Sequence, residues 1–144
     1  MKQLNKFQLT MPSRSANESF ARVAVSAFIT QLDPTLEEIN DIKTAVSEAV
    51  TNCIVHAYRE TIGNIYITVN ITTENLVIIR IRDTGCGIED IEKAKEPLFT
   101  TAGGERAGLG FAVMESFMDS LKVTSRLGKG TTVVMKKHIF SKGR

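Results

Sequence analysis

Two pairs of alternating segments in this chain are joined by links that are too short to hold a helix. Apolar and polar side chains alternate over residues 65–72 and 76–82, with three residues between the two segments. Residues 121–126 and 131–139 are separated by a four-residue turn that contains Gly128. Parallel strands need a crossover of roughly a dozen residues or more, so links of this length predict antiparallel hairpins. The pattern argues against a doubly wound parallel sheet.

The remaining regular pattern is helical. Apolar residues recur at helical spacing after Ser15, and Asp33-Pro34 interrupts them. Thr35 and Glu38 then form a capping-box pattern that opens a second helix. We expect helices over residues 15–32, 36–57, 89–95 and 109–118, and a weak edge strand over 4–11. This order of elements predicts a two-layer α+β sandwich.

Composition narrows the class of protein. A length of 144 residues suits one domain, which we expect to span residues 1–144. A net charge of +2 is too small to indicate binding to nucleic acid or to an anionic membrane. No apolar run reaches the roughly 18 residues of a membrane span, and no signal-peptide segment opens the chain. Cys53 and Cys86 lie far apart with no zinc-binding spacing, which is typical of a reduced, cytoplasmic protein.

The long second helix carries two polar residues at the border of its apolar stripe. Glu48 and Asn52 lie four residues apart, on a stripe edge where a side chain is half buried. A half-buried amide needs hydrogen-bond partners. Taken alone, the helix does not require a functional role for these residues. Glu48 could simply be solvated, and Asn52 could bond a loop carbonyl.

Two glycine motifs follow. Asp83-Thr84-Gly85-Cys86-Gly87 comes directly after a strand, where a carboxylate could accept a hydrogen bond from an exocyclic amine such as that of adenine, although Asp-x-Gly is also a common turn. The segment 106–110, Arg-Ala-Gly-Leu-Gly, precedes a helix whose free N–H groups could bind phosphate. It is neither a phosphate-binding P-loop nor a dinucleotide fingerprint, and alone it could be a hinge.

In combination and in this order, the motifs resemble the GHKL nucleotide-binding superfamily. Nearly the whole chain is similar to the anti-sigma factor serine kinases, and within them to the anti-sigma-F type of endospore-forming bacteria. The similarity is carried by NESFAR (17–22), QLDPT (31–35), IKTAVSEAVTN (42–52), EPLFTT (96–101), the GF after the glycine motif, and GKGTTV (128–133). The resemblance implies a Bergerat-type ATP-binding fold, with a mixed, mostly antiparallel sheet and helices on one face.

The resemblance implies a role for each residue of the first two motifs. Glu48 matches the catalytic acid that takes the proton of the attacking hydroxyl. Asn52 matches the side chain that binds Mg²⁺. Asp83 matches the carboxylate that recognises the adenine amine, and Gly85 and Gly87 match residues beside the base.

Further residues are implied by the same resemblance. Residues 97–107 match the lid over ATP, which begins near Thr100 and Thr101. Arg106 matches a catalytic residue that meets the terminal phosphates. Gly108, Leu109 and Gly110 match the phosphate-binding turn, Thr131 supports the adenine pocket, and Arg22 contacts a protein partner.

The implied activity is that of an ATP-dependent protein serine kinase with ATP or ADP and Mg²⁺ as ligands. It would phosphorylate a serine of an anti-anti-sigma factor, and as a homodimer it would hold sigma factor F, with no direct contact with nucleic acid or membrane. The motifs leave open a general-stress anti-sigma kinase and a module that uses ATP only as a structural effector. A histidine kinase domain ranks lower, because no phosphoacceptor hairpin accompanies His56 or His138. No role is assigned to His56, Cys53 or Cys86.

Overall fold

The computed structural model describes residues 2–95 and 104–140, and it describes the side chains of these residues except for 104–107. Its five strands form one sheet in the order β1-β2-β3-β5-β4, and every neighbouring pair is antiparallel. The strands are β1 (Gln3–Pro12), β2 (Asn64–Thr72), β3 (Leu76–Asp83), β4 (Ser120–Arg126) and β5 (Gly130–His138). Both predicted hairpins are confirmed, and the described sheet is wholly antiparallel where a mixed sheet was expected.

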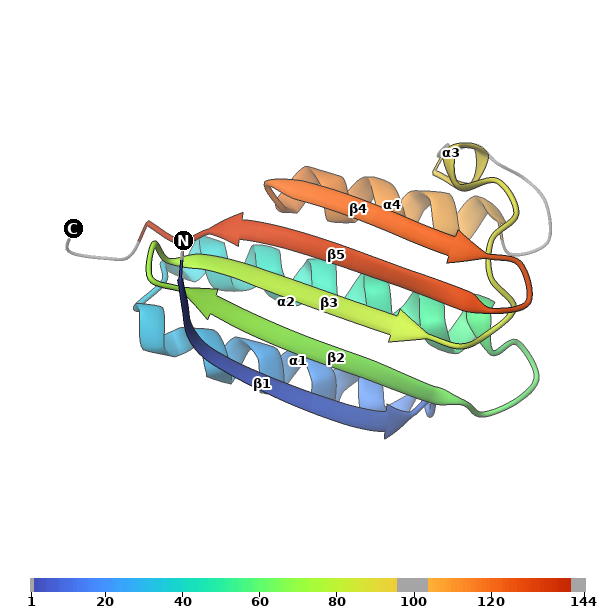
Figure 1. Ribbon diagram of the computed structural model, residues 1–144, viewed down its shortest axis with the longest axis horizontal. Helices are drawn as coiled ribbons and strands as arrows, with labels where there is room; N and C mark the ends of the chain where they lie inside the picture. The colour runs from blue at the N-terminus through green and yellow to red at the C-terminus, as the bar shows by residue number, and fades with distance from the viewer. Residues whose placement is uncertain (1, 96–103, 141–144) are drawn as a thin grey trace.

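The helices cover one face of this sheet (Figure 1). They are α1 (Ala16–Ile29), the 3₁₀ turn η1 (Thr30–Leu32), α2 (Leu36–Thr51), the π-helical segment η2 (Asn52–Ala57), α3 (Ile91–Ala94) and α4 (Gly104–Phe117). The two-layer α+β class is therefore confirmed. The predicted helix over 89–95 is shorter than expected.

The core lies between α2 and the inward face of the central strands. The predicted stripe of α2 is buried, with Ile42 and Val46 fully inaccessible. The register places Ile67 of β2 opposite Ile81 of β3, and both side chains are buried on the same face. Burial of such a side chain contributes roughly 1.5–3 kcal/mol, so these contacts fix α2 firmly on the sheet.

The second helix does not stay α-helical to Ala57, as its periodicity predicted. It is π-helical from Asn52 onward, and the N–H of Tyr58 bonds the carbonyl of Cys53, five residues back. Such wide turns are rare and are found often at functional sites. The sequence carries no sign of the change, because the apolar pattern of a single π turn still resembles that of an α-helix.

The last helix also begins earlier than predicted. α4 starts at Gly104 rather than near Leu109, so Gly108 and Gly110 lie inside the helix. Each glycine inside a helix costs about 1 kcal/mol relative to alanine. Gly110 compensates through packing, because a Cβ at this position would lie 3.2 Å from Oε2 of Glu48 and from Oδ1 of Asn52. Close contact between α4 and α2 therefore explains this glycine better than a turn does.

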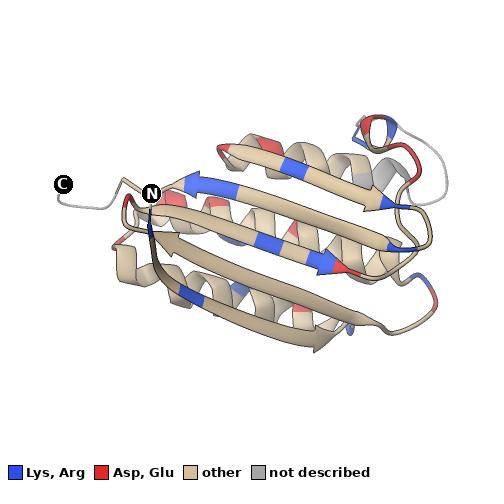
Figure 2. Ribbon diagram, viewed as in Figure 1, with Lys and Arg blue, Asp and Glu red and all other residues tan. Residues whose placement is uncertain are grey.

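Charged residues are distributed unevenly over the strands (Figure 2). The strands contain a single acidic residue, Asp83, which is buried at the end of β3. Their basic residues are Lys6, Arg80, Arg82, Lys122, Arg126, Lys136 and Lys137. A buried carboxylate in an otherwise basic sheet calls for a specific explanation.

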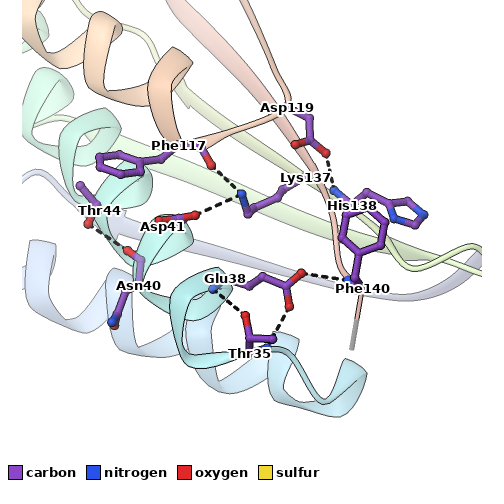
Figure 3. A network of polar contacts seen from close by, with 10 residues as sticks. All are labelled: Thr35, Glu38, Asn40, Asp41, Thr44, Phe117, Asp119, Lys137, His138 and Phe140. Atoms are coloured by element: carbon purple, nitrogen blue, oxygen red, sulfur yellow. Dashed lines mark hydrogen bonds and ion pairs between the residues drawn. The ribbon is translucent and has the colours of Figure 1, made fainter. Parts of the chain in front are cut away.

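A polar network joins α2, α4 and β5 near the C-terminal end of β5 (Figure 3). Nζ of Lys137 donates to the carbonyl of Phe117, at the end of α4, and lies 3.3 Å from Oδ2 of Asp41 in α2. Glu38 completes the predicted capping box with Thr35 and also accepts a 2.9 Å hydrogen bond from the N–H of Phe140. These contacts hold the two helices against the end of the sheet.

Glu38 should make stability depend on pH. Burial alone would raise the pKa of its carboxyl, but hydrogen bonds from Phe140 and Thr35 outweigh burial and lower the pKa. Ionised Glu38 therefore stabilises the fold fully above its usual pKa of about 4.3, and the contribution disappears as the pH falls through the lower folded value. We expect Glu38→Gln to reduce the free energy of unfolding by about 1–2 kcal/mol at pH 7 and by much less in acid.

Urea unfolding of the wild type and of Glu38→Gln at pH 7 and near pH 3.5 measures this difference. Glu37→Gln is the matched control, because Glu37 lies in the same first turn of α2 and is exposed. If Glu38→Gln lowers the free energy of unfolding equally at both pH values, the charge of Glu38 is not the source of its stabilising effect.

Candidate functional site

A cavity of about 850 Å³ opens between the end of α2, the ends of β3 and β5, and the segment that follows β3. This volume lies in the usual range for small-molecule and cofactor sites. Four residues predicted from the motifs line it: Asn52, Asp83, Gly87 and Thr131. Apolar side chains, including Ile81 and Val133, form part of its wall.

The carboxylate of Asp83 is held by its surroundings in one orientation. Oδ1 accepts hydrogen bonds from the N–H groups of Gly85, at 2.9 Å, and of Thr131, at 3.2 Å. Oδ2 has the Cys53 thiol as a donor, at 3.6 Å. Burial raises the pKa of Asp83, although these hydrogen bonds oppose the shift. A carboxylate oxygen can accept two hydrogen bonds, so Oδ2 can accept one from a ligand in the cavity in addition to that from the thiol.

The segment after β3 is docked on the end of η2. The N–H of Cys86 bonds the carbonyl of Ala57, and a Cβ on Gly85 would lie 2.4 Å from that carbonyl oxygen. Only glycine permits so close an approach. Gly85 is not among the residues that line the cavity, whereas Gly87 is. Gly85 therefore sets the position of this wall rather than forming its surface.

Ser125 connects this wall to the β4–β5 hairpin. Its hydroxyl accepts from the N–H of Ile88 at 2.8 Å, donates to the carbonyl of Gly130 at 3.0 Å, and lies 2.8 Å from Oγ1 of Thr131. Gly130 has a φ of +119°, and a Cβ there would lie 2.2 Å from the carbonyl oxygen of Asp83. The hairpin thus packs directly on the end of β3. Ser125 could have been found from the sequence, since the four-residue turn places it opposite Thr131.

Tyr58 is a second residue that the motifs missed. Its hydroxyl accepts from the N–H of Thr84 at 2.7 Å and donates to the carbonyl of Asn64 at 2.6 Å. The side chain is buried and joins the end of η2 to the residue after Asp83. No sequence pattern signals this role, because the partners are 6 and 26 residues away.

Glu48 and Asn52 lie one helical turn apart, as the sequence predicts, and both face α4 close to Gly110. Asn52 lines the cavity, and its Nδ2 is buried without a hydrogen-bond partner among the described residues. An unsatisfied buried amide is costly, which fits a side chain whose partner is a ligand. Glu48 is half buried and is not among the lining residues.

The donors present also fit a particular kind of metal. In the described ranges, no three His, Cys, Asp or Glu side chains are grouped closely enough to hold a metal ion. A cation here would need to take most of its ligands from a substrate and from water. Mg²⁺ binds in that way, often with one or two protein oxygens together with phosphate oxygens.

The predicted phosphate-binding turn is helical in the structure. Gly108 and Gly110 are buried within α4, while Leu109 is half exposed. The backbone of Arg106 lies in α4, but its side chain is outside the described part. Thr100 and Thr101, at the start of the predicted lid, also lie outside the described residues.

Arg22 lies in α1 and faces α2, and it is not a cavity residue. Its guanidinium is 3.7 Å from Oε1 of Glu18 and donates to Ser47 at 3.5 Å. Ser47 in turn donates to Glu18. The Arg22 side chain is still 39% exposed, so a partner could reach it.

Within residues 2–95 and 104–140, none of the helices combines the length and the apolar character needed to cross a membrane.

Comparison with known proteins identifies the family of the chain. The histidine kinase-like ATPase domain family matches residues 11–137. The chain is 58% identical over 142 residues to an anti-sigma F factor of Thermoanaerobacter sp. (strain X514), covering 98% of this chain and 99% of the relative. It is 55% identical over 134 residues to an anti-sigma F factor of Clostridium acetobutylicum, covering 92% and 93%.

Solved structures support the fold at lower identity. The crystal structure of RsbU and RsbW domains from Mycobacterium tuberculosis matches with a TM-score of 0.70 and 17% identity, covering 94% of this chain and 33% of that one. A histidine kinase domain from Erythrobacter litoralis matches with a TM-score of 0.56 and 19% identity, covering 85% and 60%. The matched family and the two relatives cover nearly the whole chain, so this protein belongs to the histidine kinase-like ATPase domain family and, within it, to the anti-sigma F factors.

Proposed function

We propose that this protein uses Mg-ATP to phosphorylate a serine of an anti-anti-sigma factor, and that it binds sigma factor F and withholds it from RNA polymerase. The observation that carries the proposal is that Asn52 and Asp83 line one cavity, with Glu48 one helical turn from Asn52 and beside the same glycine of α4. The name shared by the relatives favours sigma factor F over the general-stress alternative. Both partners belong to the cytoplasm, where we place the protein.

Membership in this family makes the chain an ATP-dependent kinase of the anti-sigma factor type that binds ATP or ADP. In our proposal, Oδ2 of Asp83 accepts a hydrogen bond from the exocyclic amine of adenine. Ile81 and Val133 offer apolar contacts to the base, and Gly87 leaves room beside it. Gly85 and Thr131 keep the Asp83 carboxylate in place through their N–H groups.

Asn52 is the residue that would hold Mg²⁺, through its side-chain oxygen. The ion, when bound, would neutralise charge on the phosphates. The unsatisfied amide of Asn52 supports this role, since a rotation of the side chain exchanges its oxygen and nitrogen. We place Gly108, Leu109 and Gly110 near the phosphates, together with Thr100 and Thr101 of the lid, from the family resemblance.

Glu48 acts as the base in the proposed reaction. The serine oxygen attacks the γ-phosphorus, the bond to the β–γ bridging oxygen breaks, and ADP leaves with that electron pair. The serine proton passes to the Glu48 carboxylate. Arg106 would offset the charge on the phosphates during transfer.

We propose that Arg22 contacts a protein partner through its exposed side chain. We also propose that the chain acts as a homodimer. Arg22 is held by Glu18 and Ser47, so its guanidinium is presented in a restricted orientation. A restricted charged group loses less entropy on binding than a free one.

The kinase proposal predicts stoichiometric phosphoserine on the anti-anti-sigma factor after incubation with the protein, Mg²⁺ and labelled ATP. Phosphoserine is identified by mass spectrometry, and sigma factor F binding is measured separately by calorimetry with ATP or ADP present. If the folded chain binds ATP and sigma factor F but yields no phosphoserine, the kinase proposal fails and ATP serves only as a structural effector.

A further inference from the structure

Cys53 is the second residue of η2, and the family motifs give it no role. Its side chain is 4% exposed and lines the cavity. Its Sγ donates to Oδ2 of Asp83 at 3.6 Å, a normal length for a hydrogen bond from sulfur. Among the described residues, the thiol is the donor on this oxygen, while two N–H groups occupy Oδ1.

The two oxygens of Asp83 thus have separate donors. The backbone N–H groups of Gly85 and Thr131 fix Oδ1, and without a second contact the carboxylate could still turn about that point. The Cys53 thiol supplies that second contact from the helix layer. Oδ2 keeps a free lone pair. The direction of this lone pair decides how well Oδ2 can accept a hydrogen bond from a donor in the cavity.

The surroundings of Cys53 suit a side chain that acts through one contact. The side chain is buried, and its Sγ lies 3.6 Å from Oδ2 of Asp83. A thiol with these surroundings is inert as a nucleophile, so its contribution is geometric.

We propose that Cys53 is a positioning residue that aims Oδ2 of Asp83 at the exocyclic amine of an adenine nucleotide. The inference rests on the proposed function, in which Asp83 recognises that amine. It adds a determinant of base selectivity that lies on the helix layer rather than in the glycine motif.

The consequence is specific to the amine. Purine riboside triphosphate has hydrogen in place of the 6-amino group and keeps the remaining structure of ATP. The ratio of its dissociation constant to that of ATP therefore measures amine recognition alone. Loss of the thiol donor should lower this ratio. A packing defect alone should weaken the binding of both nucleotides equally and leave the ratio unchanged.

The test measures both dissociation constants by calorimetry, with the full chain, for the wild type, Cys53→Ala and Cys53→Ser. We expect the ratio to fall about three- to ten-fold in Cys53→Ala and to stay within about two-fold in Cys53→Ser, which keeps a donor. Cys53→Val removes the donor without leaving a void, and it replaces Cys53→Ala if the smaller side chain prevents folding. Cys86→Ala is the control, because the Cys86 thiol also lines the cavity but donates to the carbonyl of His56.

Asp83→Asn in the same assay separates the two claims. If Asp83→Asn removes the preference for ATP while Cys53→Ala leaves the ratio unchanged, the role of Cys53 is overturned and that of Asp83 stands. If the wild type shows no preference, or if Asp83→Asn retains it, recognition of adenine by Asp83 fails and the inference fails with it.

Discussion

Replacing Glu48 by Gln is expected to lower the single-turnover rate of phosphoryl transfer by about 10²–10⁴-fold. The substitution keeps the size of the side chain, so its contact with Gly110 across α2 and α4 is preserved. It removes the carboxylate that takes the serine proton in the proposed reaction. Because Glu48 is not among the residues that line the cavity, ATP affinity should change by less than about three-fold.

Rapid mixing of excess enzyme with labelled ATP and the anti-anti-sigma substrate measures the transfer step, and calorimetry measures ATP affinity. Glu37→Gln is the matched control, since it makes the same chemical change at an exposed position of the same helix. Transfer by Glu48→Gln within a few-fold of the wild type would mean that another group takes the proton. Equal losses of transfer and of ATP affinity would instead assign Glu48 to binding.

The elements that the sequence predicts well are those fixed by local rules. Three residues between β2 and β3 allow only a hairpin, and Thr35 with Glu38 marks the start of α2 through short-range hydrogen bonds. The errors arise where distant packing decides. Gly108 and Gly110 suggest a turn when read locally, yet both lie inside α4, where Gly110 packs closely against Glu48 and Asn52. The π turn at Asn52 likewise leaves no trace in the apolar periodicity.

The site follows the same division. Asp83 and Thr131 stand out because each belongs to a motif of consecutive residues. The structure joins the two motifs through the hydrogen bond from the N–H of Thr131 to Asp83. Ser125, Tyr58 and Cys53 act through contacts with residues far along the chain. A hydroxyl or thiol in a strand or helix has no pattern that distinguishes such a contact from ordinary packing. Ser125 is the partial exception, since the turn sets it opposite Thr131, but its bond to Ile88, like the contacts of Tyr58 and Cys53, is shown only by the tertiary structure.

Replacing Asn52 by Ala is expected to abolish the effect of Mg²⁺ on ATP binding and to lower phosphoryl transfer by about 10²-fold or more. The fold should tolerate the change. Nδ2 of Asn52 is buried with no partner among the described residues, and an unsatisfied buried donor costs about 1–3 kcal/mol. Removing it should therefore leave the free energy of unfolding unchanged or raise it slightly. A gain or retention of stability with a loss of activity is the signature of a residue kept for function.

Calorimetric titration of ATP with Mg²⁺ and with EDTA, together with urea unfolding, tests both halves of this expectation. Asn70→Ala is the matched control, because Asn70 lies in β2, away from the cavity, and is also only partly buried. If Asn52→Ala still binds ATP more tightly with Mg²⁺ than with EDTA, Asn52 is not the metal ligand. If it loses several kcal/mol of stability, the amide is bonded within the protein, and its unsatisfied donor no longer argues for a ligand. Retained stability with a lost response to Mg²⁺ would show that Asn52, at the start of η2, serves the nucleotide rather than the fold.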